Sequence, residues 1–130
     1  MEGLRAYAFV LVFLAHAADG RLSERELDTI RRQVHRHARD LGYTTLQTED
    51  MVLSILDDYH HMLDLTGEGA VLGRFRRSIQ HLCDLYGADP KVLAAIQTDM
   101  HSVAASDGSV VDMEGLLISH FAETWWRLRR

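Results

Sequence analysis

The segment AYAFVLVFLA, residues 6–15, is the longest uninterrupted apolar run of this chain of 130 residues. It is far shorter than the roughly 20 residues that a membrane-spanning helix needs. The flanking residues Glu2, Arg5 and Asp19 do not fit the basic start and small-residue cleavage site of a secretory signal. Because a helix that is apolar on nearly every face must be surrounded by other helices, we predict a buried central helix over residues 2–18.

The composition is typical of one folded helical domain that covers residues 1–130. Hydrophobic residues make up 47% and charged residues 25% of the chain, so there is enough apolar surface to offset chain entropy. The net charge of −5 disfavours nucleic acid as a partner, because phosphate binding needs a concentrated positive field. Cys83 is the only cysteine, which excludes an internal disulfide and favours a reducing, cytoplasmic setting with a buried thiol.

Helical spacing of the apolar residues predicts an all-α bundle of about six to seven helices without strands. Thr48 has the chemistry of a helix cap, and Asp89-Pro90 predicts a capped helix start, because proline at the first position loses no hydrogen bond. The closing residues WWRLRR (125–130) suit docking on the core better than a membrane anchor. After the central helix we expect helices over residues 23–42, 48–65, about 72–87, 90–105 and a last segment after the second acidic turn described next.

An acidic turn occurs twice, as AADGRLSERELDTI (residues 17–30) and as ASDGSVVDMEGLLI (residues 105–118). Each copy follows one predicted helix and precedes another, which predicts two pseudo-repeated helix-turn-helix arms related by an approximate two-fold rotation. We also predict that the glycine of each turn has positive φ or sits where a Cβ would clash. The equivalent residues are Asp19 with Asp107, Gly20 with Gly108, and Glu26 with Glu114.

Two interpretations of this turn remain open. The spacing of Asp19, Gly20 and Glu26 resembles the second half of an EF-hand loop, in which an aspartate and a closing glutamate hold a hard cation. The positions that normally carry the other ligands are alanines, so a complete EF-hand is not expected. Alternatively, Ser23-x-x-Glu26 is a capping box, in which the serine and the glutamate side chains bind each other's backbone amides.

The remaining polar clusters predict no catalytic chemistry. His35 and His37 point to different faces of a helix and His60 and His61 are adjacent, so neither pair is a ready clamp for zinc. The chain has no Ser-His-Asp or Cys-His signature and no glycine-rich phosphate loop, and we therefore predict that it is not an enzyme. The basic run RRQVHRHAR, residues 31–39, is interpreted as a solvated helix surface rather than a phosphate groove.

The motif A-x-D-G-x-apolar-x-x-x-E, placed after an apolar first helix and repeated, resembles the TerB-like family. The second copy departs from the family pattern at Ser106, Val111 and Gly115. The matching residues are Ala17, Asp19, Gly20, Leu22 and Glu26 in one copy and Ala105, Asp107, Gly108, Val110 and Glu114 in the other.

This resemblance implies a compact, non-enzymatic helical domain that acts in a tellurite-type stress response or as an interaction module. It also implies that the acidic turns can hold a divalent cation such as Ca²⁺ through Asp19, Glu26, Asp107 and Glu114. The alternative is a metal-free interaction domain in which these residues only cap helices. A protein partner is expected in both cases, a homo-oligomer is compatible with both, and membrane contact would come only through a partner.

Overall fold

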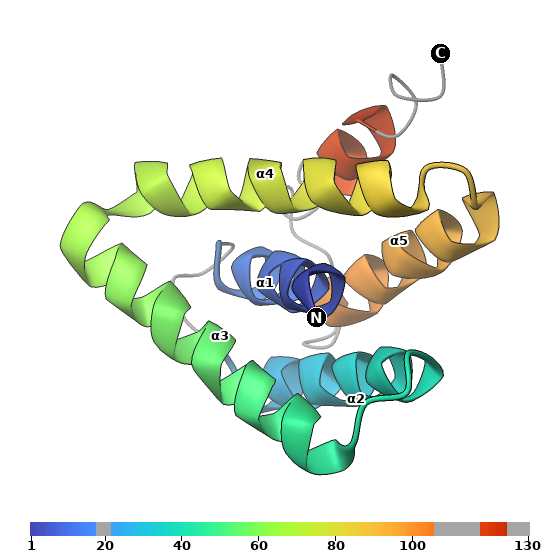
Figure 1. Ribbon diagram of the computed structural model, residues 1–130. Coiled ribbons are helices and arrows are strands. Elements are labelled where there is room, and N and C mark those ends of the chain that lie inside the picture. Colours follow the sequence, from blue (N-terminus) through green and yellow to red (C-terminus); the bar gives the residue numbers. More distant parts are fainter. Residues whose placement is uncertain (18–21, 106–117, 125–130) are drawn as a thin grey trace.

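The computed structural model describes residues 1–17, 22–105 and 118–124 (Figure 1). Residues 118–124 are helical, and the described part of the chain contains no strand, which confirms the predicted all-α class. The two acidic turns and residues 125–130 fall outside these ranges, so the two-fold relation of the arms stays a prediction. The five longer helices are α1 (Glu2–Ala17), α2 (Glu24–Asp40), α3 (Thr45–Thr66), α4 (Glu68–Tyr86) and α5 (Pro90–Ala104).

Helix α1 is the buried centre of the fold, as its apolar sequence predicts. Every side chain from Tyr7 to Ala15 is buried. Figure 1 shows α1 nearly end-on, with α4 above it, α2 below it, α3 to the left and α5 to the right, and α1 packs against all four. The ring of Phe13 stacks on that of Phe75 in α4, with the centroids 4.5 Å apart. None of the described helices is long and apolar enough to cross a membrane.

Helix α2 begins close to its predicted start and ends at Asp40, one residue before Leu41. Ser23 caps its first turn, and Gly42 follows its end with φ +87°, a conformation that glycine adopts without steric cost. Ile30 and Val34 are buried as expected. Leu41 continues the helical spacing of this buried face, but it is exposed because it is the C-cap residue, beyond the last helical residue.

The predicted start of α3 is wrong by one turn. The helix begins at Thr45, and its cap is Thr44, whose side chain accepts a hydrogen bond from the Gln47 amide while Gln47 reaches back to the Thr44 amide. Thr48 is instead buried within the first turn, and its hydroxyl donates to the Thr44 carbonyl at 2.8 Å. The reciprocal pair at Thr44 and Gln47 satisfies two free backbone amides, which a lone threonine cannot do.

The break between α3 and α4 is a single residue, shorter than the gap left between the helices predicted over residues 48–65 and about 72–87. Gly67 has φ +78° and serves as the end of α3 and the start of α4, and Gly69 lies inside α4. One glycine in this conformation redirects the chain without a longer loop. The start of α5 is as predicted, because an Asp89 carboxylate oxygen accepts the amides of Lys91 and Val92 and Pro90 is the first helical residue.

The inner faces of α4 and α5 close the core around α1. Phe75, Ile79 and Leu82 of α4 are fully buried, and so is Leu93 of α5. Cys83 is also buried, as predicted, and burial followed by the charge of the adjacent Asp84 raises the pKa of its thiol to about 11. The thiol therefore stays protonated at neutral pH, which disfavours a nucleophilic role.

Candidate functional site

Of the four residues of the predicted acidic site, the structure describes only Glu26. Glu26 is 3% exposed and forms a complete capping box with Ser23. The Ser23 amide donates to Glu26 Oε1 and the Glu26 amide donates to Ser23 Oγ, both at 3.1 Å. The capping interpretation of Glu26 is thus confirmed. The other three predicted ligands, Asp19, Asp107 and Glu114, lie outside the described residues. The two turn glycines, Gly20 and Gly108, lie outside them as well.

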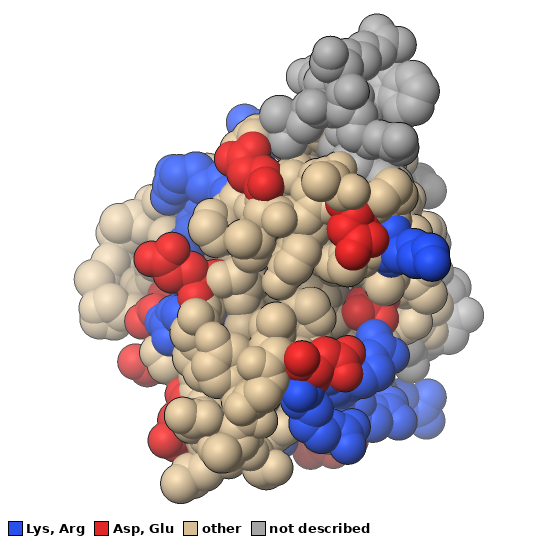
Figure 2. Space-filling view, turned by 45° about the vertical axis from the view of Figure 1, so that its right-hand side comes forward, with Lys and Arg blue, Asp and Glu red and all other residues tan. Residues whose placement is uncertain are grey.

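The outer side of α2 carries a dense group of basic side chains. Ile30 and Val34 are buried on the inner side of the helix, whereas most of the arginines are exposed on its outer side, namely Arg25, Arg32, Arg36 and Arg39. The group borders a groove of about 930 Å³, to which Ser102 of α5 also contributes. Figure 2 shows these side chains gathered at the lower right of the molecule. We call this surface the α2 arginine face; its members are Arg25, Arg31, Arg32, Arg36 and Arg39.

Arg36 is held in place by a buried carboxylate on α5. Its Nη2 donates to Asp99 Oδ1 at 2.6 Å, and the hydroxyl of Tyr7 in α1 donates to Asp99 Oδ2 at 2.6 Å. Asp99 is 6% exposed, whereas the Arg36 side chain is 54% exposed. The hydrogen bond to Asp99 raises the pKa of Arg36, and burial, then the Asp99 charge, raises the pKa of Tyr7. One carboxylate therefore links α1, α2 and α5 beneath the groove.

Two histidines of α2 pack against other helices. His35 contacts the carboxylate of Glu49 in α3 through Nε2. His37 lies on another face, with its ring centroid 4.9 Å from that of Tyr7 and 6.1 Å from that of Tyr86. Burial lowers the pKa of His37 below its usual 6.5, which favours the neutral ring. The two residues point to different faces, as the sequence predicts, and each packs against a different helix.

The charged run that was interpreted as a plain solvated surface is more organised than that. Arg36 and His35 make contacts between helices, and Arg31 Nε is buried without a hydrogen-bond partner among the described residues. A buried donor without a partner costs about 1–3 kcal/mol. The arginine face therefore combines side chains held by other helices with exposed ones.

His60 Nδ1 lies 2.8 Å from the Leu56 carbonyl oxygen of its own helix. Across the described ranges, no three His, Cys, Asp or Glu side chains lie close enough together to hold a metal ion. Of the predicted cation ligands at the acidic turns, only Glu26 lies within these ranges.

Comparison with known proteins returns no match, whether to a family model, to a curated protein or to a solved structure. The TerB-like resemblance consequently rests on the quoted motif residues alone. The α2 arginine face groups five arginines around one groove.

Sequence reasoning missed Asp99, the residue that organises this face. A signal was present, because Asp99 falls between Ile96, Met100 and Val103 on the apolar side of α5. A carboxylate at such a position is stable only when it is hydrogen-bonded or paired with a cation. The pattern predicts that Asp99 has a partner, but it does not identify Arg36 and Tyr7 as that partner.

Proposed function

We propose that this chain is a non-enzymatic, TerB-like helical interaction domain whose α2 arginine face binds an acidic segment of a partner protein in the cytoplasm. The observation that carries the proposal is the concentration of five arginines around one groove in a chain of net charge −5. Arginine suits this role because its planar guanidinium binds carboxylates through two parallel hydrogen bonds.

The dimensions of the face favour a short helical segment. Arg25 and Arg39 are separated by 14 residues of α2, which corresponds to roughly 21 Å at the rise of an α-helix. A partner helix with carboxylates every three or four residues would present a matching stripe. The acidic residues Glu24 and Asp40 stand at the two ends of α2, so a longer polyanion such as nucleic acid would meet repulsion beyond the groove.

The fixed position of Arg36 supports the same proposal. Binding normally costs about 0.5–1.5 kcal/mol for each long side chain that becomes immobilised. Asp99 already holds the Arg36 guanidinium through Nη2, so part of this cost is met before a partner arrives. Half of the Arg36 side chain stays exposed and accessible. The face is therefore partly preorganised for a carboxylate ligand.

We expect a synthetic helical peptide with glutamates on one face to bind the protein in a salt-dependent manner. The double variant Arg32→Glu with Arg39→Glu should weaken binding by about tenfold or more, because a tenfold loss corresponds to only 1.4 kcal/mol. Fluorescence anisotropy of the labelled peptide measures the dissociation constants. Both replaced side chains are exposed, so the fold should be unaffected.

The matched control is Arg76→Glu with Lys91→Glu, which makes the same change in net charge at two exposed positions of α4 and α5. It should retain binding within about twofold, since surface charges more than a Debye length from the site are screened. Equal losses in the two double variants would contradict a specific face. Tighter binding of a DNA duplex than of the peptide, abolished by the α2 variant, would assign the face to nucleic acid instead.

A second candidate function is divalent cation binding at the acidic turns, favoured by the buried position of Glu26 at the point where a closing ligand would lie. If a cation binds, Ca²⁺ at 100 times its dissociation constant should stabilise the fold by about 2.7 kcal/mol. Glu26→Gln should abolish that increment and keep metal-free stability within about 0.5 kcal/mol, because glutamine still serves in a capping box.

Thermal melts of the parent, Glu26→Gln and Glu114→Gln, in chelator and with Ca²⁺, Mg²⁺ or Mn²⁺, measure this effect. Glu114→Gln should behave in the same way if the second turn also binds. A parent melting curve that is unchanged by every cation would eliminate cation binding and leave Glu26 as a cap residue only.

A further inference from the structure

A second basic pocket lies between α1 and α4, and none of its residues belongs to the α2 arginine face. Its volume is about 500 Å³, within the range of small-molecule sites. Arg5 enters from the first turns of α1, whereas the other basic residues come from α4. The described residues that line it are Glu2, Arg5, Ala6, Arg74, Arg77, Ser78 and His81.

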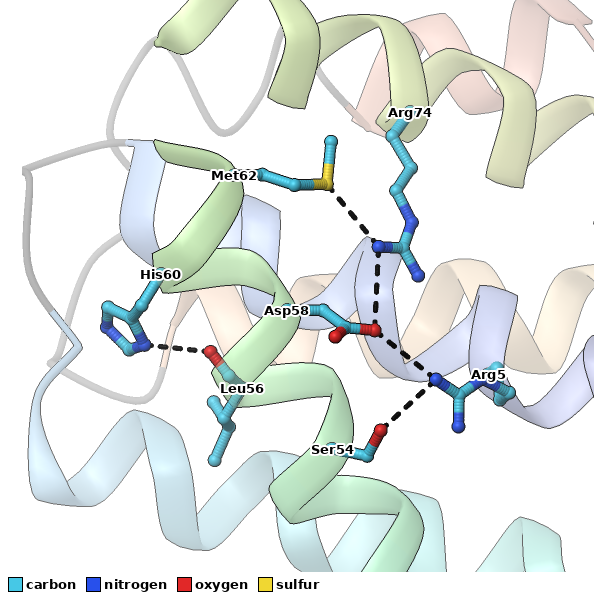
Figure 3. A network of polar contacts seen from close by, with 7 residues as sticks. All are labelled: Arg5, Ser54, Leu56, Asp58, His60, Met62 and Arg74. Atoms are coloured by element: carbon cyan, nitrogen blue, oxygen red, sulfur yellow. Dashed lines mark hydrogen bonds and ion pairs between the residues drawn. The ribbon is translucent and has the colours of Figure 1, made fainter. Parts of the chain in front are cut away.

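Two of the arginines share a single carboxylate of α3 (Figure 3). Arg5 Nη2 lies 3.4 Å and Arg74 Nη1 lies 3.9 Å from the same oxygen, Asp58 Oδ2. Arg5 Nη2 also donates to Ser54 Oγ, and Arg74 Nη1 donates to the sulfur of Met62. Asp58 thus provides one negative charge for two guanidinium groups, at distances longer than those of strong charged hydrogen bonds.

Each of these arginines makes its hydrogen bonds and ion pairs with described residues through one terminal nitrogen. The other terminal nitrogens, Nη1 of Arg5 and Nη2 of Arg74, donate no hydrogen bond to any described residue. Figure 3 shows the second terminal nitrogen of Arg74 directed toward Arg5. Because a guanidinium carries five N–H donors in a fixed plane, each side chain keeps donors for an additional anion.

The Arg74 guanidinium is held rigidly and is partly removed from water. Its central carbon lies 4.5 Å from the ring centroid of Phe9, a cation–π arrangement, and its side chain is 27% exposed. Burial lowers the pKa of Arg74, with Asp58 acting in the opposite direction. A bound anion would compensate the lost hydration of this charge, and the fixed plane would reduce the entropy lost on binding.

The charge balance of the pocket is positive. Arg77 forms no ion pair with a described residue, and it lies beside Gly73, where an added Cβ would be 3.4 Å from Arg77 Nη1. Three arginines therefore face two carboxylates, Asp58 and Glu2, before any contribution from His81. An anion is the ligand that this set of donors and charges fits.

We infer that this pocket binds the phosphate monoester group of a small molecule. A phosphate monoester accepts hydrogen bonds on three oxygens and pairs with arginine through two of them at once, which matches the free terminal nitrogens of Arg5 and Arg74. The volume exceeds that of a phosphate alone, so an organic part can lie along Ala6 and Ser78. The inference is independent of the proposed partner of the α2 arginine face.

Isothermal titration of the full chain with inorganic phosphate and with glycerol 3-phosphate tests this inference. Arg77→Ala should weaken binding by about tenfold, since it removes one charged hydrogen-bond donor from the pocket. Arg76→Ala is the matched control, because Arg76 is the exposed neighbour on α4 and does not line the pocket, and it should bind like the parent. Glu2→Gln should tighten binding about threefold by removing a nearby negative charge.

Vesicles of phosphatidylcholine with and without phosphatidic acid distinguish a lipid headgroup from a soluble phosphate. Binding to phosphatidic acid vesicles that Arg77→Ala weakens, with no binding of glycerol 3-phosphate, would assign the same phosphate chemistry to a lipid. Saturable binding of glycerol 3-phosphate that Arg77→Ala weakens and Glu2→Gln tightens supports a soluble ligand. Absence of binding to both, or equal effects of Arg77→Ala and Arg76→Ala, overturns the inference.

Discussion

Replacing Leu11 with alanine is expected to lower the free energy of unfolding by about 3–5 kcal/mol. Leu11 is completely buried in the middle of α1, which packs against all four neighbouring long helices. The loss combines the transfer free energy of the removed atoms with the cavity that remains, because a helix enclosed on every side cannot collapse into the space. Urea denaturation followed by circular dichroism measures the change.

The matched control for this prediction is Leu46→Ala. Leu46 is 73% exposed on α3, so the same change of side chain should alter stability by no more than about 0.5 kcal/mol. If Leu11→Ala and Leu46→Ala lowered the free energy of unfolding by similar amounts, α1 would not be the central element that the burial of its side chains indicates. A decrease in the free energy of unfolding below about 1 kcal/mol for Leu11→Ala would equally contradict a central position of α1.

The second large effect is expected at Asp99. In Asp99→Ala the hydroxyl of Tyr7 remains buried without its acceptor, which costs about 1–3 kcal/mol, and Arg36 loses its carboxylate. The Arg36 term is small because that side chain is half exposed and screened by solvent. We therefore expect a total destabilisation of about 2–3 kcal/mol by chemical denaturation.

A double-mutant cycle isolates the contact between Tyr7 and Asp99. Tyr7→Phe alone should lower the free energy of unfolding by about 1 kcal/mol. Asp99→Ala should have a smaller effect in the Tyr7→Phe protein than in the parent, because no buried tyrosine hydroxyl is then left without an acceptor. Asp64→Ala, at an exposed aspartate of α3, should leave stability nearly unchanged. Additive effects of the Tyr7 and Asp99 replacements would contradict the hydrogen bond between them.

The helices themselves could be predicted because their apolar residues recur at helical spacing and several ends carry a distinctive chemical signal. Ser23 with Glu26 and Asp89 with Pro90 both mark helix starts correctly. The start of α3 was misplaced because Thr44 and Thr48 have the same capping chemistry, and only the glutamine three residues after Thr44 separates them. Local signals thus predict helix ends well when the reciprocal partner is considered.

The candidate binding surfaces were less predictable, because they depend on how helices pack. Asp58 follows Arg5 by 53 residues, and nothing in the local pattern of either helix pairs them. The basic run of α2 was visible, yet its groove depends on Ser102 of α5 and on the anchoring of Arg36 by Asp99. Side chains on one helix can be assigned to faces from sequence, whereas contacts between helices require the fold.

Nuclear magnetic resonance can locate the surface that binds the acidic peptide, which we propose to be the α2 arginine face. During titration with the acidic helical peptide, we predict that amide signals shift along residues 25–39 and near Ser102, while the outer side of α3 around Leu53 stays unchanged. The shifts should disappear in Arg32→Glu with Arg39→Glu. Shifts centred on α3 or α4, or undiminished shifts in that double variant, would contradict peptide binding at the α2 arginine face.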